Sequence, residues 1–416
     1  MKLKYGEKEL YFKLNPDKIA KILKAEEKSG ILNPLQKMKE SLEDPIGTPG
    51  LEELLQKKSP ENIIIIVNDV SRPTPYEYML PPLLAKIHKT GIKKEQVTFI
   101  IATGIHEPHD RQQNENVFGK ELVENYEFVS HDPDDNLVKV DKLSSGNELY
   151  INKKVVKADF VITTGVILPH YFAGFSGGRK SILPGVAGRE SIEFNHSRMV
   201  ELIGDLPPIK ENFLSNEMFE AAEKTGVDFI INVVTNSNRE IVEIVAGDLK
   251  KAWYRGVEVS ASMYQVSLKN KVEVAIVSAG GYPRDINLYQ AQKALDHGDH
   301  GVKKGGTIIV IAECIDGLGE KTFARWINEA GSPEDNIERI KKKFELGGHK
   351  AFAISRVVQN KELILISSLD RETTESLFAR KMDNIQDAIN YVEKKYNNNY
   401  ESIIMPQGGL TVPVLD

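Results

Sequence analysis

The sequence has one cysteine, Cys314, in 416 residues. A single thiol cannot form an internal disulfide or a multi-cysteine zinc site, so both are excluded as the basis of the fold. Basic residues are also too few for a general nucleic-acid binder, because 54 lysines and arginines stand against 60 acidic residues and the net charge is -6. Such binders carry a basic excess, and we therefore expect no nucleic-acid partner.

Long hydrophobic runs are absent too. The longest aliphatic run, Ile63–Val67, is far shorter than the roughly 20 apolar residues that cross a bilayer. The opening segment MKLKYGEKELYFKL alternates charged and apolar side chains and lacks the apolar core of a signal peptide. We expect a cytoplasmic protein with no membrane partner.

Short β-branched runs alternate with longer segments of helical periodicity. The runs predict strands at Ile63–Val67, Val97–Ile101, Phe160–Thr163, Phe229–Val234, Val272–Val277, Thr307–Ile311, Leu363–Ile366 and Ile403–Met405. Helices are predicted at Tyr78–His88, Leu249–Tyr264, Leu288–Asp296, Pro333–Phe344 and Ile385–Lys395. This alternation indicates an α/β protein with mainly parallel sheets flanked by helices.

A polar stretch at Ser267–Lys271 separates two series of such segments. It predicts a larger domain over residues 1–268 and a smaller one over 269–400, with the tail 401–416 packing back on the first. Ligands of open α/β sheets bind at the carboxyl ends of the strands. We therefore expect the active site in the cleft between the two domains.

Two polar loops follow predicted strands. Asp69 and Arg72 follow the first, and an arginine at such a position suits an anionic ligand. The alternative is a helix-capping aspartate beside a solvated arginine. His106 and His109 follow the second strand, as a metal pair, a general base or plain surface residues.

The segment Gly165–Gly185 is rich in glycine and ends in Arg179-Lys180-Ser181. It departs from the phosphate-loop pattern by one residue and by its distance from the strand. Exposed amides with Arg179 and Lys180 still suit an anion, and the arginine could lower the lysine pKa and make its amine a nucleophile. A flexible linker is disfavoured by the aromatic side chains.

Three further candidates lie in helical stretches. His196 suits a metal ligand or a core histidine. Gln290 and Lys293 share a helix face and suit a carboxylate, or else begin an ordinary amphipathic helix. His297 and His300 are interpreted as a surface turn, with a metal pair as the alternative.

Four separated motifs resemble the nickel-pincer lactate racemase family, whose members racemise or epimerise 2-hydroxy acids. The motifs match in order and spacing, and the resemblance covers essentially the whole chain. They are Asp69–Pro75, the Thr-Gly-x-His loop ending at His106, the series His170, Lys180 and His196, and Tyr289-Gln290-x-x-Lys293.

The resemblance implies a role for each position. His106 and His170 are the acid/base residues, and His196 is a nickel ligand. Lys180 bonds covalently to the nickel pincer of pyridinium-3-thioamide-5-thiocarboxylic acid mononucleotide and belongs to the metal site. The other implied cofactor contacts are Asp69, Val70, Ser71, Arg72, Gly177, Gly178 and Arg179. The implied substrate contacts are Arg72, Tyr289, Gln290 and Lys293.

The implied activity is an isomerase that interconverts D- and L-lactate by proton-coupled hydride transfer to the cofactor, with pyruvate bound in between. Family members depend on sulfur-inserting and nickel-inserting proteins, so chain made without them is expected to lack the cofactor. Oligomeric state stays open, a homo-oligomer included. The alternatives are another 2-hydroxy acid as substrate, a zinc or manganese hydrolase, and a non-catalytic nucleotide-binding module.

Overall fold

The computed structural model describes residues 1–202 and 207–416. The chain divides into two compact units, each described separately below. Unit 2 comprises Glu27–Met199 and the residues after 206 up to Ala261, whereas Met1–Glu26 and Ser262–Asp416 belong to unit 1, together with a short segment that begins at Val200. In the described residues, no helix is both long and apolar enough to cross a membrane.

Unit 2 is built on a six-stranded sheet whose strands pair in parallel, except for one edge strand, Ile241–Gly247, which pairs antiparallel with its neighbour. Its order is β13 (Ile241–Gly247), β12 (Phe229–Thr235), β9 (Phe160–Val166), β4 (Ile63–Asn68), β5 (Val97–Ala102) and β6 (Glu127–Ser130). The helices of this unit are α1 (Pro34–Glu43), α2 (Leu51–Lys58), α3 (Tyr76–Lys89), α4 (Arg111–Phe118), α5 (Lys120–Asn125), α6 (Lys153–Val156), α7 (Arg189–Ser197), α8 (Phe213–Thr225) and most of α9 (Lys251–Tyr264).

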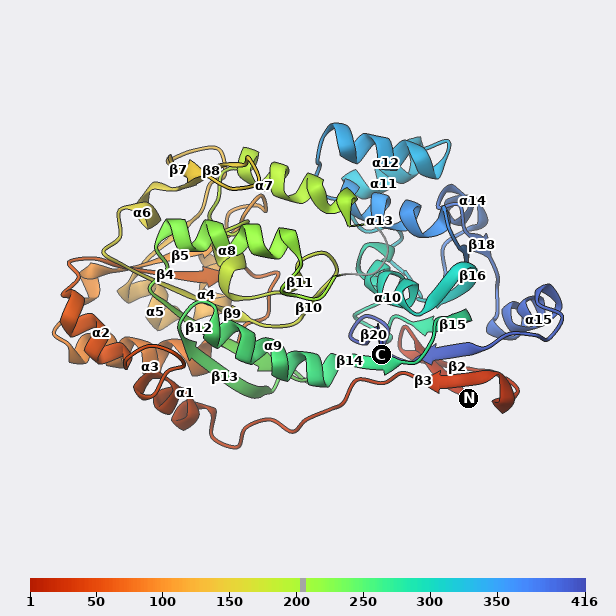
Figure 1. The fold of residues 1–416 in the computed structure, drawn as a ribbon, viewed down its shortest axis with the longest axis horizontal. Helices are drawn as coiled ribbons and strands as arrows, with labels where there is room; N and C mark the ends of the chain where they lie inside the picture. Colours follow the sequence, from red (N-terminus) through yellow and green to blue (C-terminus); the bar gives the residue numbers. More distant parts are fainter. Residues whose placement is uncertain (203–206) are drawn as a thin grey trace. The chain divides into compact units, whose positions relative to one another are not determined.

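The core of unit 2 follows from the two-residue period of its strands. Ile63, Ile65 and Val67 of β4 point to one face, where they pack with buried side chains of α1, α2 and α3. Because the alternate residues Ile64 and Ile66 are buried as well, both faces of this sheet are covered. The ribbon shows α1, α2 and α3 gathered together (Figure 1).

Unit 1 holds a second six-stranded sheet, which is parallel throughout. Its order is β18 (Arg380–Lys381), β17 (Glu362–Ile366), β16 (Val302–Ile311), β15 (Val272–Ser278), β19 (Ser402–Met405) and β3 (Ile19–Ile22). Its helices are α10 (Leu288–His300), α11 (Lys321–Glu329), α12 (Pro333–Lys342), α13 (Gly348–Val358), α14 (Arg371–Ser376) and α15 (Ile385–Lys395).

Two-stranded ribbons complete the two units. Three are antiparallel: β1 (Lys2–Tyr5) with β2 (Lys8–Tyr11), β7 (Leu137–Lys142) with β8 (Glu148–Asn152), and β10 (Pro169–His170) with β11 (Gly174–Phe175). The fourth is parallel and joins β14 (Gln265–Leu268) to β20 (Val412–Leu415). The α/β prediction with two mainly parallel sheets is confirmed, and all eight predicted strands and five predicted helices form.

The contacts divide the chain differently from the predicted domains at both ends. Residues 1–26 were assigned to the first domain, yet β3 pairs with β19, so this segment completes the sheet of unit 1. The tail 401–416 also stays in unit 1, since β20 pairs with β14 in the stretch predicted to be a linker. Both pairings join residues more than 140 positions apart, and local sequence patterns carry no signal for them.

Candidate active site

The first polar loop begins where β4 ends, and its turn is built around Asp69. This carboxylate is buried, and its Oδ1 accepts hydrogen bonds from the Ser71 backbone N–H at 3.2 Å and from Ser71 Oγ at 2.6 Å. The Arg72 N–H donates to the Asp69 carbonyl at 3.1 Å and closes the turn. The Arg72 side chain is exposed beyond it.

Asp69 also bonds to His106, which lies in the loop after β5. Asp69 Oδ2 and His106 Nδ1 are 2.6 Å apart. Burial alone would raise the pKa of Asp69, but hydrogen bonds from His106 and Ser71 lower it below its usual value. The ionised carboxylate can only accept, so Nδ1 carries the proton and Nε2 keeps its lone pair. The imidazole is 39% exposed, which leaves that lone pair accessible to a ligand.

His109 has a different task from His106. Its Nε2 accepts the Val70 backbone N–H at 2.9 Å, and its Nδ1 lies 3.0 Å from Asn114 Oδ1. Both ring nitrogens are therefore used inside the protein, and the histidine fixes the loop that carries Asp69. A metal pair of His106 and His109 is not formed, and the described residues hold no cluster of three or more His, Cys, Asp or Glu side chains suited to a metal ion.

The glycine-rich segment forms the hairpin β10–β11 and then the short 3-10 helix Gly178–Ser181. At the start of this helix Gly177 and Gly178 both have positive φ, and a Cβ on Gly178 would lie 2.8 Å from Trp253. The Gly178 N–H donates to Asn232 Oδ1 at 3.0 Å. Glycine is thus needed for close packing of this turn on the sheet.

Lys180 and His170 meet at this turn. Lys180 Nζ lies 3.1 Å from His170 Nε2. Burial, followed by the positive charge of Arg72, lowers the pKa of Lys180 well below its usual value. Burial and then the Lys180 charge lower the pKa of His170 in the same way. Both shifts favour the uncharged forms, and a lower pKa increases the fraction of Lys180 that is present as the nucleophilic free amine.

One buried aromatic ring joins three of the predicted residues. Phe172 makes edge contacts with the rings of His170 and His196, at centroid distances of 4.6 and 4.9 Å. Lys180 Nζ lies 4.9 Å from the same ring. The structure thus brings His170, Lys180 and His196 together, although they come from three different segments. Sequence reasoning gave Phe172 no role of its own.

The Arg179 side chain packs inside the protein. It is fully buried, and its guanidinium donates to Ser215 Oγ and to the carbonyls of Ala173 and Phe175. It also stacks on Trp253, 3.8 Å from the ring centroid. These contacts hold the hairpin in place, whereas Arg179 Nη1 is buried without a hydrogen-bond partner among the described residues, and the contact of Arg179 with the cofactor stays a prediction.

Two supporting residues were missed by sequence reasoning. Asn232 anchors the Gly178 turn, and the only sequence signal was a polar residue in the apolar strand FIINVVT. Trp253 Nε1 donates to the Ser176 carbonyl at 2.9 Å and packs under Arg179. Neither residue belongs to a recognisable motif.

The remaining predicted residues lie in unit 1, on α10. The Asn287 side chain caps this helix by accepting the Gln290 N–H at 3.0 Å. Gln290 and Lys293 are both exposed on one side of the helix, as their spacing predicts. Lys350 Nζ bonds to the carbonyl of Tyr289 and lies 4.4 Å from its ring centroid.

His297 and His300 were predicted to form a surface turn, and this is wrong. Both lie in the last turns of α10, 6% and 7% exposed. His297 Nδ1 bonds to the Gly408 carbonyl at 2.7 Å. The Asp-His-Gly-Asp-His sequence suggested a turn, but the helix continues through Gly298 because that glycine lies against Val277, where a Cβ would be only 2.9 Å away.

A mainly parallel α/β sheet with an Asp–His pair and a lysine of lowered pKa beyond the carboxyl ends of its strands is typical of an enzyme that moves protons. Two family models match the chain, the lactate racemase N-terminal domain over residues 5–203 and the lactate racemase C-terminal domain over residues 268–414. The chain therefore belongs to the lactate racemase family.

Individual relatives agree with this family. The lactate racemase of Thermoanaerobacterium thermosaccharolyticum is 36% identical over 421 residues, covering 98% of this chain and 97% of that protein. The lactate racemase of Lactiplantibacillus plantarum is 34% identical over 350 residues, 81% of each chain.

Solved structures give the same result for the fold. The structure of the lactate racemase apoprotein from Thermoanaerobacterium thermosaccharolyticum covers 99% of both chains, with a TM-score of 0.90 and 34% identity. A Thermotoga maritima protein is similar in fold, with a TM-score of 0.65 and 19% identity.

The residues present suit the cofactor implied by the family resemblance. The lowered pKa of Lys180 favours the free amine that a covalent bond needs, and His196 offers an imidazole that contacts the same Phe172 ring. In the described part of the chain the Arg72 guanidinium makes no ion pair, while its charge acts on both Lys180 and His170. An unpaired arginine next to neutral bases suits an anionic nucleotide.

Proposed function

We propose that this chain interconverts D- and L-lactate with a nickel-pincer nucleotide attached to Lys180. The observation that carries the proposal is the contact of Lys180 Nζ with His170 Nε2 at 3.1 Å, together with a histidine, His106, that is oriented by Asp69 at the end of another strand of the same sheet. When bound, this cofactor supplies a centre that accepts the α-hydrogen of the substrate with its electron pair and returns it. The side chains of this protein then have to manage protons and orientation.

The two histidines handle the hydroxyl proton. The lone pair on His106 Nε2 suits the role of general base, because Asp69 fixes the opposite nitrogen as a donor and stabilises the charged ring after proton transfer. His170 is neutral and suits the same role for the other enantiomer. Since the two enantiomers present their hydroxyl groups on opposite sides, one histidine accepts the proton of D-lactate and the other that of L-lactate.

The carboxylate of the substrate needs fixed positive and polar partners. Gln290 and Lys293 are exposed on one side of α10 and offer an amide donor and an ammonium. We assign them to the substrate carboxylate, with Tyr289 and Arg72 as further contacts. Asp69, Val70, Ser71, Arg72, Gly177, Gly178 and Arg179 remain proposed cofactor contacts, and sulfur-inserting and nickel-inserting proteins remain proposed maturation partners.

The attachment site is tested by mass. Chain produced together with the maturation proteins should show a covalent adduct that Lys180→Ala loses. Lys154→Ala, which removes a surface lysine paired with Glu127, serves as the control and should keep the adduct. An adduct of unchanged mass on Lys180→Ala would refute the assignment.

The substrate is tested by chiral analysis. Matured enzyme given pure D-lactate or pure L-lactate should approach an equal mixture from either side. If lactate is unchanged while another 2-hydroxy acid loses its optical purity, the substrate assignment fails but the racemase class stands.

A further inference from the structure

Helix α7, which carries His196, has little apolar surface to hold it. Its buried residues are Ser191, Ile192 and Asn195, and only Ile192 is apolar. Phe194 is 38% exposed. The hydrophobic effect therefore contributes little to fixing the position of this helix, and polar contacts must do most of it.

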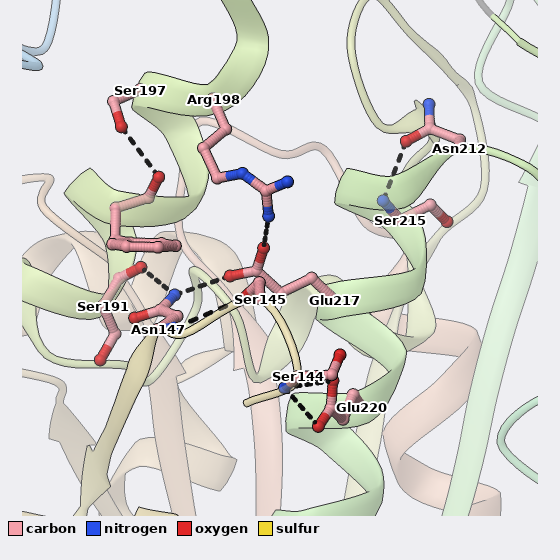
Figure 2. A network of polar contacts seen from close by, with 11 residues as sticks. Ser144, Ser145, Asn147, Ser191, Ser197, Arg198, Asn212, Ser215, Glu217 and Glu220 are labelled. Carbon is pink, nitrogen blue, oxygen red and sulfur yellow. Dashed lines mark hydrogen bonds and ion pairs between the residues drawn. The ribbon is translucent and has the colours of Figure 1, made fainter. Parts of the chain in front are cut away.

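A chain of polar contacts links the two ends of α7 (Figure 2). At the first end, Asn147 Nδ2 donates to the Ser191 carbonyl at 2.9 Å, and the same nitrogen donates to Glu217 Oε1 at 2.7 Å. At the second end, Arg198 Nη1 bonds to Glu217 Oε2 at 2.9 Å. One carboxylate from α8 thus connects both ends of α7.

Glu217 is well suited to this task. Its side chain is 2% exposed, so its ion pair with Arg198 is shielded from water and salt. Both of its oxygens are occupied by donors, one from each side. Figure 2 shows Arg198 extending from the end of α7 towards Glu217 on the neighbouring helix.

The Glu217–Arg198 ion pair is linked to His196 through the backbone. The Arg198 N–H donates to the His196 carbonyl at the end of the helix. The Arg198 guanidinium also lies over the Phe213 ring, 4.7 Å from its centroid, which limits its freedom. A change at Glu217 therefore alters the restraint on the residue two positions from the imidazole.

We infer that Glu217 is a positioning residue which, through Arg198 and Asn147, sets the place of His196 in the metal site. This inference rests on the proposed role of His196 as a nickel ligand. Groups that orient a metal ligand without touching the metal typically change metal affinity by about 10- to 100-fold when they are removed.

The test compares nickel loss with retention of the covalent adduct. Glu217→Gln is close in shape, but its NH₂ group cannot accept a hydrogen bond, so one of the two donors, Asn147 or Arg198, loses its acceptor. In the matured variant the adduct on Lys180 should stay complete. Nickel should pass to a chelator about 10- to 100-fold faster than in wild type. The visible absorption of the bound cofactor should shift, a change that lower stability alone would not cause.

Two controls separate positioning from general damage. Glu223 lies on α8, as Glu217 does, and makes an exposed ion pair with Lys250. Glu223→Gln removes this ion pair and should release nickel at the wild-type rate. Val97→Ala weakens the core of the same unit away from α7, and should also keep nickel. Fast nickel loss from Val97→Ala, or wild-type retention in Glu217→Gln, would overturn the inference.

Further variants keep the result interpretable. If Glu217→Gln does not fold, Arg198→Met breaks the same contact from its more exposed side and should give the same nickel loss. In cofactor-free chain, Glu217→Gln should speed amide hydrogen exchange in Arg189–Ser197. If His196→Ala retains nickel, the assignment of His196 as a nickel ligand fails and the inference fails with it, whereas the proposed racemase activity is still tested by the chiral assay. If His196→Ala loses nickel but neither Glu217→Gln nor Arg198→Met does, only the inference fails.

Discussion

Asp69→Asn should remove most of the racemase activity without removing the cofactor. In the native protein the carboxylate accepts from Ser71 on one oxygen and from His106 on the other. An asparagine can satisfy the two Ser71 donors only through its own oxygen, which turns its NH₂ group towards His106. Nδ1 of His106 must then accept, and the ring proton moves to Nε2.

The magnitude follows from the loss of the base. With a proton on Nε2, His106 can no longer take the hydroxyl proton of the substrate. General acid–base catalysis contributes about 10²- to 10⁴-fold, which is a rise of about 2.7–5.4 kcal/mol in the barrier. Because every turnover visits both enantiomers, kcat should fall by this factor in both directions.

The assay is racemisation by matured variant whose adduct and nickel content match wild type. Asp141→Asn, at an exposed ion pair with Lys224, is the matched control and should retain full activity. A kcat for Asp69→Asn within threefold of wild type would mean that the Asp69–His106 contact does not control the protonation of the ring.

Three further outcomes are expected. Lys293→Ala should weaken apparent substrate affinity by about 10- to 100-fold, in line with the loss of a charged hydrogen bond, and unchanged KM in loaded enzyme would refute its role. His106→Ala and His170→Ala should each stop racemisation. In single-turnover absorbance measurements, one variant should still react with D-lactate and the other with L-lactate. Equal residual rates with both enantiomers would contradict the assignment of one histidine to each enantiomer. Burial lowers the pKa of His297 to about 4, below the roughly 6.5 of an unfolded histidine, so its neutral form stabilises the fold above pH ~6.5 and this stability is lost as the pH falls towards 4. In urea unfolding between pH 7 and pH 5, His297→Asn, which can still donate to Gly408, should lose about 2 kcal/mol less than wild type, and equal losses would rule out this histidine as the cause.

The sequence was sufficient for elements whose signal is local. The run Ile63–Val67 predicts a buried strand because every residue in it is β-branched, and β4 forms there. The edge strand β3 could not be predicted, since its partner β19 lies almost 400 residues later and its own side chains are mostly exposed. Antiparallel β13 was missed as well, because partly exposed residues interrupt its apolar pattern.

The candidate site shows the same limit. Spacing selected His106, but the contact with Asp69, on a different strand end, is visible only after folding. The packing of Arg179 could not be predicted, because sequence alone does not reveal that Ala173, Phe175 and Ser215 accept hydrogen bonds from its Nε and Nη2.

The pairing of β3 with β19 has a consequence for how the chain is made. Residues 19–22 leave the ribosome early, yet their partner strand is synthesised only once residue 402 has been added. Unit 2, which ends at Ala261, has its whole sheet available long before that point. Strand β3 must therefore wait through nearly the entire translation, and a chain that stops before residue 402 leaves it without its place in a sheet. A separately expressed unit 1 would need this amino-terminal segment supplied together with the rest.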